Sequence, residues 1–361
     1  MIKTDFVREG TTNVLVYKNK ISEKGPGKKQ GLPFYNPSME QNRDISIIIC
    51  QWLVNNSKKP IMLLDGLAAS GIRGIRIANE VTGNFNVTIN DWDINAYELI
   101  MKNVKEKNIE VYNKNLNTIL SEGKFDYIDI DPFGSPVNFI DSAVRSIKNN
   151  GIIAATATDT ATLCGVYPIV CKRRYSSTPF HSNVMKEIGL RILIGYICRE
   201  AAKYDKAIEP ILCYSTDHYF RIYIKILNGV NKANKSIKMY KIIKTKEPIS
   251  HEKNIDIGPL WMGKLLNKKE IKNLRTVLLK KDLKTKNKLY KLFDIFEEET
   301  DSPSFFYSTD ELSSYFKTSA PKLELIINKL ITKGFIATRT HFSPTAFKTN
   351  ASFSDIKNIF K

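Results

Sequence analysis

The 361-residue sequence lacks the long apolar segments that membrane insertion or export would require. No run of about 18 uncharged apolar residues occurs, and the start, MIKTDFVREGTTNVLVY, lacks the apolar core of a signal peptide. We therefore expect a cytoplasmic protein that does not contact membranes. Apolar residues still make up 42% of the chain, which is enough for a full core, and the length favours two domains.

Cysteine is scarce as well. The five cysteines, Cys50, Cys164, Cys171, Cys198 and Cys213, are odd in number, scattered and never spaced as C-x-x-C. This pattern argues against a disulfide framework and against a zinc knuckle. We expect reduced, mostly buried thiols and no bound metal.

Acidic residues are too few to balance the basic ones. The chain carries 55 Lys and Arg against 37 Asp and Glu, a net charge of +18, and residues 231–292 alone hold 18 basic against 5 acidic residues. A polyanion-binding surface needs such a surplus, because neutralised phosphates release condensed counterions. The alternative is a lysine-rich surface that is merely solvated, in a chain whose composition follows an AT-rich genome. We favour a nucleic-acid partner.

Short apolar segments alternate with helical patterns in the first half of the chain. The predicted strands are residues 61–65, 86–91, 125–131 and 151–158. Their alternation with helices predicts an α/β fold with a doubly wound parallel sheet. Asp65, Asp91 and Asp131 each end a predicted strand, so we expect the three carboxylates to meet at one edge of the sheet.

The loop after the first predicted strand lacks the dinucleotide fingerprint G-x-G-x-x-G. Its glycines, Gly66, Gly71 and Gly74, are spaced five and three residues apart, which argues against a dehydrogenase. A loop of small residues also suits S-adenosylmethionine, because the backbone can approach the cofactor closely. Asp91, at the end of the next strand, can accept hydrogen bonds from ribose hydroxyls. A purely structural turn remains the alternative.

The stretch YIDIDPFGSP, residues 127–136, combines a carboxylate with proline, an aromatic ring and glycine. An exocyclic amine of a nucleobase is a poor nucleophile that needs acceptors for its protons and a stacking surface. We predict that Asp131 accepts a proton, Pro132 contributes a carbonyl and Phe133 stacks on the base. Alternatively, Asp131 caps the turn before the helix that begins near Val137 and simply bonds backbone amides. Asp129 could complete a metal-binding pair, but no further ligands cluster beside it.

Several longer stretches together resemble the tRNA (guanine-26-N2)-dimethyltransferase family over nearly the full length. They are FYNPSMEQNRDI (34–45), LDGLAASGIRGIR (64–76), NDWDINAYEL (90–99), DIDPFGSP (129–136), TATDTATLCG (156–165), DHYFR (217–221), GPLWMG (258–263) and ATRTHFSPTAFKT (337–349). The resemblance implies a class I methyltransferase fold with a Rossmann-like sheet. It also implies successive transfer of two methyl groups from S-adenosylmethionine to N2 of guanosine 26 in tRNA.

The resemblance carries residue roles as well. Arg43 and Arg73 match arginines that contact S-adenosylmethionine in the family, and Asp91 matches the acid at its ribose. Asn115 and Leu116 align where the family tends to show an acid followed by alanine near the adenine, so this chain lacks a charge there. The DPF stretch matches the catalytic residues.

We divide the chain into a methyltransferase domain, residues 1–229, and a basic α+β tRNA-binding domain, residues 230–361. Within the latter, residues 308–340 show the helix, turn, helix, strand order of a winged-helix unit, with apolar residues at helical spacing that must face a core. We expect the protein to act as a monomer.

Two other functions remain open at this point. One is an adenine N6 or cytosine N4 amino-methyltransferase of DNA, whose motif follows the same logic but usually carries a second proline and then Tyr or Phe. The other is a catalytically idle tRNA-binding or chaperone module. The cofactor loop, Asp91 and Asp131 argue against the idle module.

Overall fold

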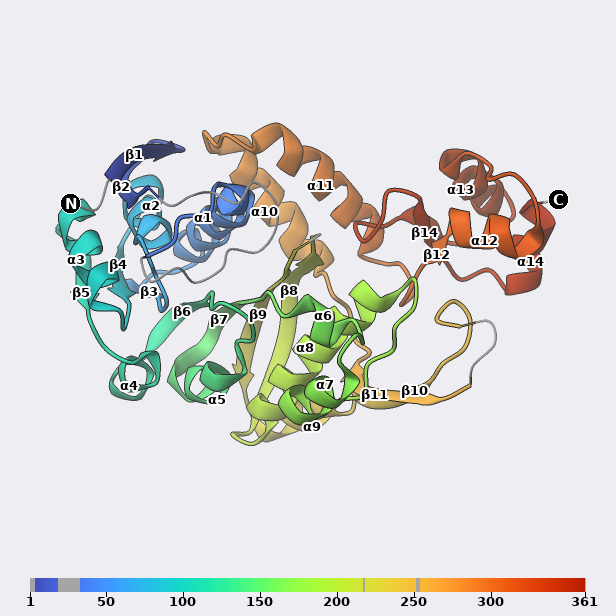
Figure 1. The fold of residues 1–361 in the computed structure, drawn as a ribbon, viewed down its shortest axis with the longest axis horizontal. Coiled ribbons are helices and arrows are strands. Elements are labelled where there is room, and N and C mark those ends of the chain that lie inside the picture. The colour runs from blue at the N-terminus through green and yellow to red at the C-terminus, as the bar shows by residue number, and fades with distance from the viewer. Residues whose placement is uncertain (1–3, 19–32, 217, 251–253, 361) are drawn as a thin grey trace.

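A seven-stranded sheet forms the centre of the molecule (Figure 1). The computed structural model describes residues 4–18, 33–216, 218–250 and 254–360. In spatial order the strands are β5 (Ile109–Tyr112), β4 (Phe85–Asn90), β3 (Ile61–Asp65), β6 (Phe125–Ile130), β7 (Ile147–Ala157), β9 (Phe220–Asn228) and β8 (Lys206–Ser215). The first five run parallel, whereas β9 is antiparallel to both β7 and β8.

Helices cover both faces of this sheet. In Figure 1, α1 (Glu40–Asn55) and α10 (Lys268–Lys280) lie on one side, and α5 (Val137–Ser146) and α8 (Met185–Ala202) lie on the other. The other helices up to α8 are η1 (Pro37–Met39), α2 (Ile72–Glu80), α3 (Ile94–Asn103), α4 (Leu116–Glu122), α6 (Thr160–Leu163) and α7 (Pro168–Tyr175). Coverage of both faces explains why strands such as β3, IMLLD, are apolar without alternation. The predicted doubly wound α/β fold is confirmed.

The strand order reverses beside β3, which has β4 on one side and β6 on the other. Ligands of doubly wound sheets bind outside the carboxyl ends of the strands at such a switch point. Asp65 ends β3, Asp91 follows β4 and Asp131 follows β6, and all three line the same cavity. The predicted meeting of these carboxylates is therefore confirmed.

A small separate core lies at the C-terminal end of the chain. Its elements are β12 (Tyr307–Ser308), α12 (Thr309–Phe316), α13 (Leu323–Thr332), β13 (Ala337–Arg339), β14 (Ala346–Thr349) and α14 (Phe353–Phe360). The three strands form one sheet, and Ile326 and Leu330 of α13 are fully buried in its core. This unit projects at one end of the molecule (Figure 1), and its element order confirms the predicted winged-helix arrangement.

The segment before this unit joins the main core instead. Its elements are α9 (Val230–Ile237), β10 (Tyr240–Lys244), β11 (Asp256–Trp261), α10 and α11 (Lys286–Glu299). Their buried side chains, such as Leu260, Leu274 and Phe293, pack into the cluster that surrounds the central sheet, and that cluster includes Phe306. The small core thus begins at Tyr307, although Phe342 and Ala346 also pack into the main cluster. The domain boundary at residue 229 remains a prediction.

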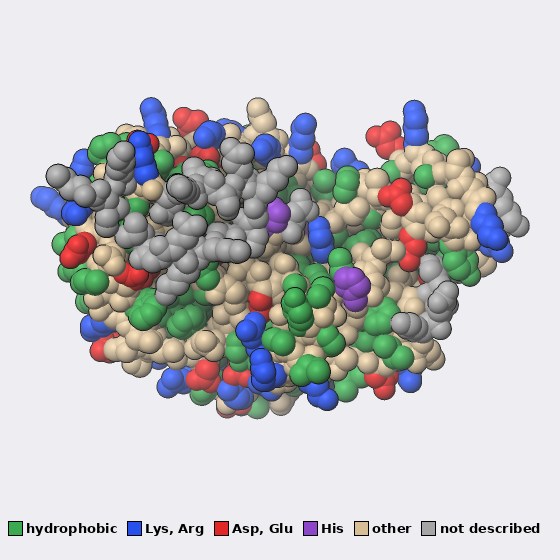
Figure 2. Space-filling view, viewed as in Figure 1, with side chains coloured by type: hydrophobic (Ala, Val, Ile, Leu, Met, Phe, Trp, Pro, Cys, Tyr) green, Lys and Arg blue, Asp and Glu red, His purple; other side chains and the backbone are tan. Residues whose placement is uncertain are grey.

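The basic segment is consequently spread over two sides of the molecule. Helix α9 contacts β8 and α8, whereas α10 contacts α1 on the opposite side of the sheet. Figure 2 shows lysine and arginine side chains of the molecule along both its upper and its lower edge, interspersed with acidic ones. Residues 251–253 of this segment lie outside the described residues. A single binding surface cannot use all of its charge.

A buried charge cluster ties the C-terminal unit to the main core. Lys348 Nζ lies 3.0 Å from a carboxylate oxygen of Glu299 and 3.0 Å from one of Glu187, a residue of α8. His341 Nδ1 lies 2.6 Å from the other oxygen of Glu299. Burial alone would raise the pKa of Glu299, but His341 and Lys348 together hold that pKa below its usual value. Glu299 therefore stays ionised.

We expect Glu299→Gln to lower the free energy of unfolding by about 3 to 5 kcal/mol, because it leaves the buried Lys348 cation short of a counter-charge. The neighbouring Glu298 offers a matched control, since it pairs with Arg339 while both side chains are about half exposed, at 40% and 45%. Glu298→Gln should cost less than about 1 kcal/mol. Urea unfolding followed by circular dichroism measures both values. Equal losses would mean that the cluster contributes no more than a surface pair.

Candidate active site

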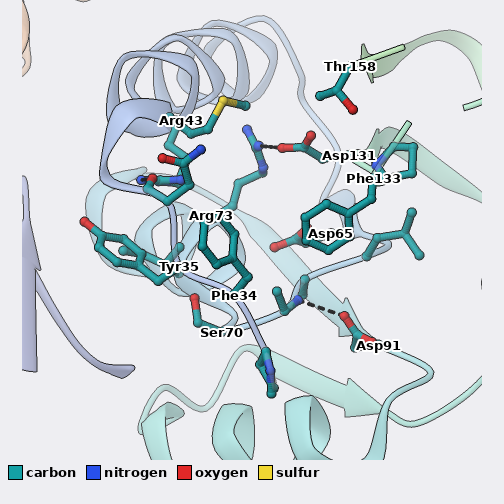
Figure 3. A pocket seen from close by; sticks show the side chains of 18 of the residues that line it. Phe34, Tyr35, Arg43, Asp65, Ser70, Arg73, Asp91, Asp131, Phe133 and Thr158 are labelled. Carbon is teal, nitrogen blue, oxygen red and sulfur yellow. Dashed lines mark hydrogen bonds and ion pairs between the residues drawn. The ribbon is translucent and has the colours of Figure 1, made fainter. Parts of the chain in front are cut away.

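A cavity of about 720 Å³ opens at the carboxyl ends of β3, β4 and β6 (Figure 3). Its wall includes the segment before α1, the loops after β3 and β4, the turn after β6 and the turn between β8 and β9. This volume lies within the range of about 300 to 1,000 Å³ that is typical of small-molecule sites. All the predicted site residues except Asn115 and Leu116 line it.

The loop after β3 and the acid after β4 hold each other in position. Asp91 accepts hydrogen bonds from the Ala69 N–H at 2.8 Å and from the Asp93 N–H at 3.0 Å (Figure 3). Ala69 adopts a left-handed backbone conformation with φ 49°, and the small side chains of Ala68, Ala69 and Ser70 line the cavity. A ligand can therefore approach the backbone of this loop. The carboxylate of Asp91 beside this loop fits a ligand with vicinal hydroxyls, such as those of the ribose in S-adenosylmethionine.

Arg73 of α2 binds the predicted catalytic carboxylate directly. Its guanidinium donates to Asp131 (Figure 3), to Asn42 Oδ1 at 2.8 Å and to Ser46 Oγ at 2.7 Å. Burial alone would lower the pKa of Arg73, but Asp129 and Asp131 raise it, so the group stays protonated. Asp131 is only partly buried, with 21% of its side chain exposed. Arg73 thus holds the carboxylate of Asp131, which remains accessible from the cavity.

Asp129 has a different environment from Asp131, although the two lie two residues apart. Both of its carboxylate oxygens accept from Arg221, at 3.0 and 2.6 Å, and one also accepts from the Tyr127 hydroxyl. Burial would raise the pKa of Asp129, but Arg221 and Arg73 lower it. Among the described residues, no group of three or more His, Cys, Asp or Glu side chains could hold a metal ion. Asp129 is therefore the acid of a buried ion pair.

The turn after β6 presents an aromatic ring to the cavity. Gly134 has φ 89°, its N–H donates to Thr158 Oγ1 at 2.7 Å, and its carbonyl accepts from the Thr158 N–H at 2.9 Å. The Phe133 side chain, 56% exposed, lies with its ring centroid 6.2 Å from that of Phe34. Helix α5 begins after Pro136 without a side-chain cap. Among the described residues Asp131 bonds Arg73 and no backbone amide, so the alternative of an Asp131-capped turn is wrong.

Arg43 lines the cavity from α1 and is fixed by a residue that the sequence did not suggest. Its Nε donates to Glu9 at 2.8 Å, its guanidinium lies 5.3 Å from the ring centroid of Tyr35, and the Tyr35 hydroxyl donates to Glu9 at 2.7 Å. Glu9 comes from the hairpin of β1 (Thr4–Glu9) and β2 (Thr12–Tyr17). The stretch FYNPSMEQNRDI contains both Tyr35 and Arg43, whereas nothing in the sequence suggested Glu9.

The structure does not bring Asn115 and Leu116 to the cavity wall. Asn115 is exposed and caps α4, where its side chain accepts from the Asn117 N–H at 2.9 Å. Leu116 is buried against Gly66, where an added Cβ would come within 2.7 Å of the leucine side chain. The sequence alignment could not reveal these positions, because a motif does not distinguish a residue that caps a helix or packs in the core from one that contacts a ligand. Their contact with a cofactor stays a prediction.

Asp65 is a further acid beneath the loop. It accepts from the Gly74 N–H at 2.9 Å and so joins β3 to the start of α2. Burial raises the pKa of Asp65 to about 7, although Arg73 acts in the opposite direction. Asp65 thus positions the start of α2 through a carboxyl that burial makes harder to ionise.

Comparison with known proteins confirms the resemblance seen in the motifs. A family model described as N2,N2-dimethylguanosine tRNA methyltransferase matches residues 18–361. The tRNA (guanine(26)-N(2))-dimethyltransferase of Methanobrevibacter smithii is 38% identical over 384 residues, which cover 99% of this chain and 97% of that protein. The corresponding protein of Pyrococcus furiosus is 39% identical, with 98% of each chain covered.

A solved structure agrees with these relatives. Trm1 from Pyrococcus horikoshii, in complex with S-adenosyl-L-methionine, matches with a TM-score of 0.87 at 34% identity and covers 99% of this chain and 100% of that one. Both the sequence and the fold therefore match over nearly the full length, and the chain belongs to the N2,N2-dimethylguanosine tRNA methyltransferase family.

Proposed function

We propose that this protein transfers two methyl groups, in succession, from S-adenosylmethionine to N2 of guanosine 26 in tRNA and so forms N2,N2-dimethylguanosine. The observation that carries the proposal is the Arg73-bound carboxylate of Asp131 beside the exposed ring of Phe133, in one cavity with the Asp91 loop. The family and the amino-group chemistry of this motif agree. The stretch DPFG, rather than one with a second proline, favours guanine N2 over adenine N6 or cytosine N4.

The catalytic roles follow from the chemistry of the guanine amino group, whose lone pair is delocalised into the ring. Asp131 accepts one N–H and takes up the proton as the bond to carbon forms. The Pro132 carbonyl accepts the second N–H, and Phe133 stacks on the base. Arg73 remains protonated and keeps the carboxylate oriented. When bound, S-adenosylmethionine supplies the electrophilic methyl group.

In this proposal the residues that bind the cofactor lie at different positions along the cavity wall. Asp91 accepts the ribose hydroxyls, and Arg43 and Arg73 line the region of the cofactor. Asn115 and Leu116 belong to the proposal as adenine contacts through the family alignment alone.

Among the described residues no helix is long and apolar enough to cross a membrane. We propose that the protein acts in the cytoplasm as a monomer without a metal, with residues 230–361 as its tRNA-binding domain.

Unmodified tRNA transcripts and labelled S-adenosylmethionine test the proposal. The expected product after nuclease digestion is N2,N2-dimethylguanosine, with N2-methylguanosine as its precursor. A transcript with adenosine in place of guanosine 26 should accept no label, because adenine has no amino group at C2. Methylated adenine or cytosine, or full labelling of the substituted transcript, would contradict the proposal.

We expect Asp91→Ala to weaken S-adenosylmethionine binding by about 1.5 to 3 kcal/mol, because charge-assisted hydrogen bonds to the ribose are lost. Isothermal titration calorimetry without tRNA measures the effect. Asp91→Asn retains one acceptor oxygen and should lose less affinity, which separates a direct contact from a disturbed loop. Wild-type affinity in a folded Asp91→Ala variant would remove Asp91 from the cofactor site.

A further inference from the structure

We propose that tRNA docks on a surface of the catalytic core beside the cavity, formed by Val166, Tyr167, Ile169, Lys172 and Arg173. We call it the α7 surface, because it consists of α7 and the two residues just before its first residue. The proposal rests on the proposed function and extends it, since the parts of the chain assigned to tRNA above are the cavity and residues 230–361.

The apolar part of the α7 surface is unusually exposed. Val166 is 50% exposed, Tyr167 is 56% exposed, and Ile169, at 80%, is the most exposed of the large apolar residues that the structure describes. The same helix buries Cys171 and Tyr175 completely. The helix is therefore anchored by one face while three large apolar side chains, close together in sequence, face solvent, as they do at binding sites.

The basic part lies on the same face of the helix. Lys172 and Arg173 follow Ile169 by three and four residues, the spacing that puts side chains side by side on a helix. Both are exposed, and neither pairs with an acid among the described residues. Arg174 differs, because it pairs with Asp159 at 3.1 Å. Two cations thus stand free beside an apolar patch.

The α7 surface is attached directly to the catalytic turn. The Tyr175 and Ser135 hydroxyls lie 2.7 Å apart, and Tyr175 also donates to Asp159 at 2.8 Å. Ser135 lines the cavity, and so does Thr158, which bonds Gly134. Helices α6 and α7 face the viewer in Figure 1, and hydrophobic side chains gather over α6 in Figure 2. The buried side of α7 is therefore joined to the catalytic turn through Tyr175, and its exposed side carries the α7 surface.

The chemistry of the α7 surface fits a polynucleotide better than a protein. Free cations bind phosphates, an aromatic ring stacks on an unpaired base, and aliphatic side chains pack on sugars and base faces. The lysines of residues 231–292 cannot all serve one tRNA, because α9 and α10 lie on opposite sides of the sheet. In this proposal Lys172 and Arg173 supply phosphate contacts from the core, in addition to those of residues 231–292.

The double variant Lys172→Glu/Arg173→Glu tests the electrostatic part. We expect its affinity for a tRNA transcript to fall on the order of tenfold or more at about 0.1 M salt. The slope of log affinity against log salt should decrease by about two, at roughly one per lost phosphate contact. Lys58→Glu/Lys59→Glu is the matched control, since these exposed lysines precede β3 at the opposite edge of the sheet. The control should retain the slope of the wild type.

Tyr167→Ala tests the stacking part. Its tRNA affinity should fall about fivefold or more while the salt slope stays unchanged, because stacking involves no counterions. Fluorescence anisotropy measures tRNA binding, and calorimetry with S-adenosylmethionine checks that each variant keeps its cofactor site. Sedimentation of the wild type and of the double variant tests the other occupant, a second copy of this chain.

The outcomes separate this inference from the proposed function. If the wild type methylates tRNA but both charge-reversal variants lose the same affinity and the same slope, the α7 surface is not a tRNA site and only net charge matters. Unchanged tRNA binding with an altered oligomeric state would overturn the inference in favour of a subunit interface. A wild type that methylates no tRNA would instead refute the proposed function.

Discussion

The Arg73 guanidinium is buried between the carboxylates of Asp129 and Asp131, and the geometry of the cavity depends on this arrangement. A cation removed from water must be paired and hydrogen-bonded, because desolvation otherwise costs several kcal/mol. Both oxygens of Asp129 accept hydrogen bonds from Arg221, and Arg73 lies 3.6 Å from Asp129. The shorter contact of Arg73 is the one with Asp131. A carboxylate held in this way needs no reorganisation when a base arrives.

From Arg221 the same chain of contacts leads to the C-terminal unit. Arg221 lies in β9, and the turn before β9 contributes Thr216, His218 and Tyr219 to the cavity wall. The Ser215 N–H, at the end of β8, donates to His341 Nε2 at 3.3 Å, and His341 in turn binds Glu299. The THFSPT motif thus supports the wall of the cavity from a distance, which explains its presence in a part of the chain that has no catalytic group.

Sequence patterns were sufficient for the parts of the molecule that depend on local order. Alternating strands and helices predicted the doubly wound sheet, and the carboxylates that end its strands do meet, because parallel strands point their carboxyl ends the same way. The winged-helix arrangement followed from the order of helix, turn, helix and strand, and the helical spacing of apolar residues predicted its core.

What could not be predicted depends on contacts between distant residues. Glu9 and Arg43 are 34 residues apart, and Asp129 and Arg221 are 92 apart, so no periodicity reveals either pair. The motifs contained three of these four residues but gave Arg221 no role. Similarly, VYPIV reads as a buried segment by composition, and only the fold shows that Ile169 is exposed.

The most direct measurement is the single-turnover rate of methyl transfer by Asp131→Asn with saturating tRNA and S-adenosylmethionine. The variant keeps the shape of the side chain but loses its charge and basicity, so we expect a rate about 10² to 10⁴ lower than that of the wild type. Asp141→Asn, the same change on α5 outside the cavity lining, should react at the wild-type rate. Transfer at the wild-type rate by Asp131→Asn would contradict the role of this carboxylate as the proton acceptor.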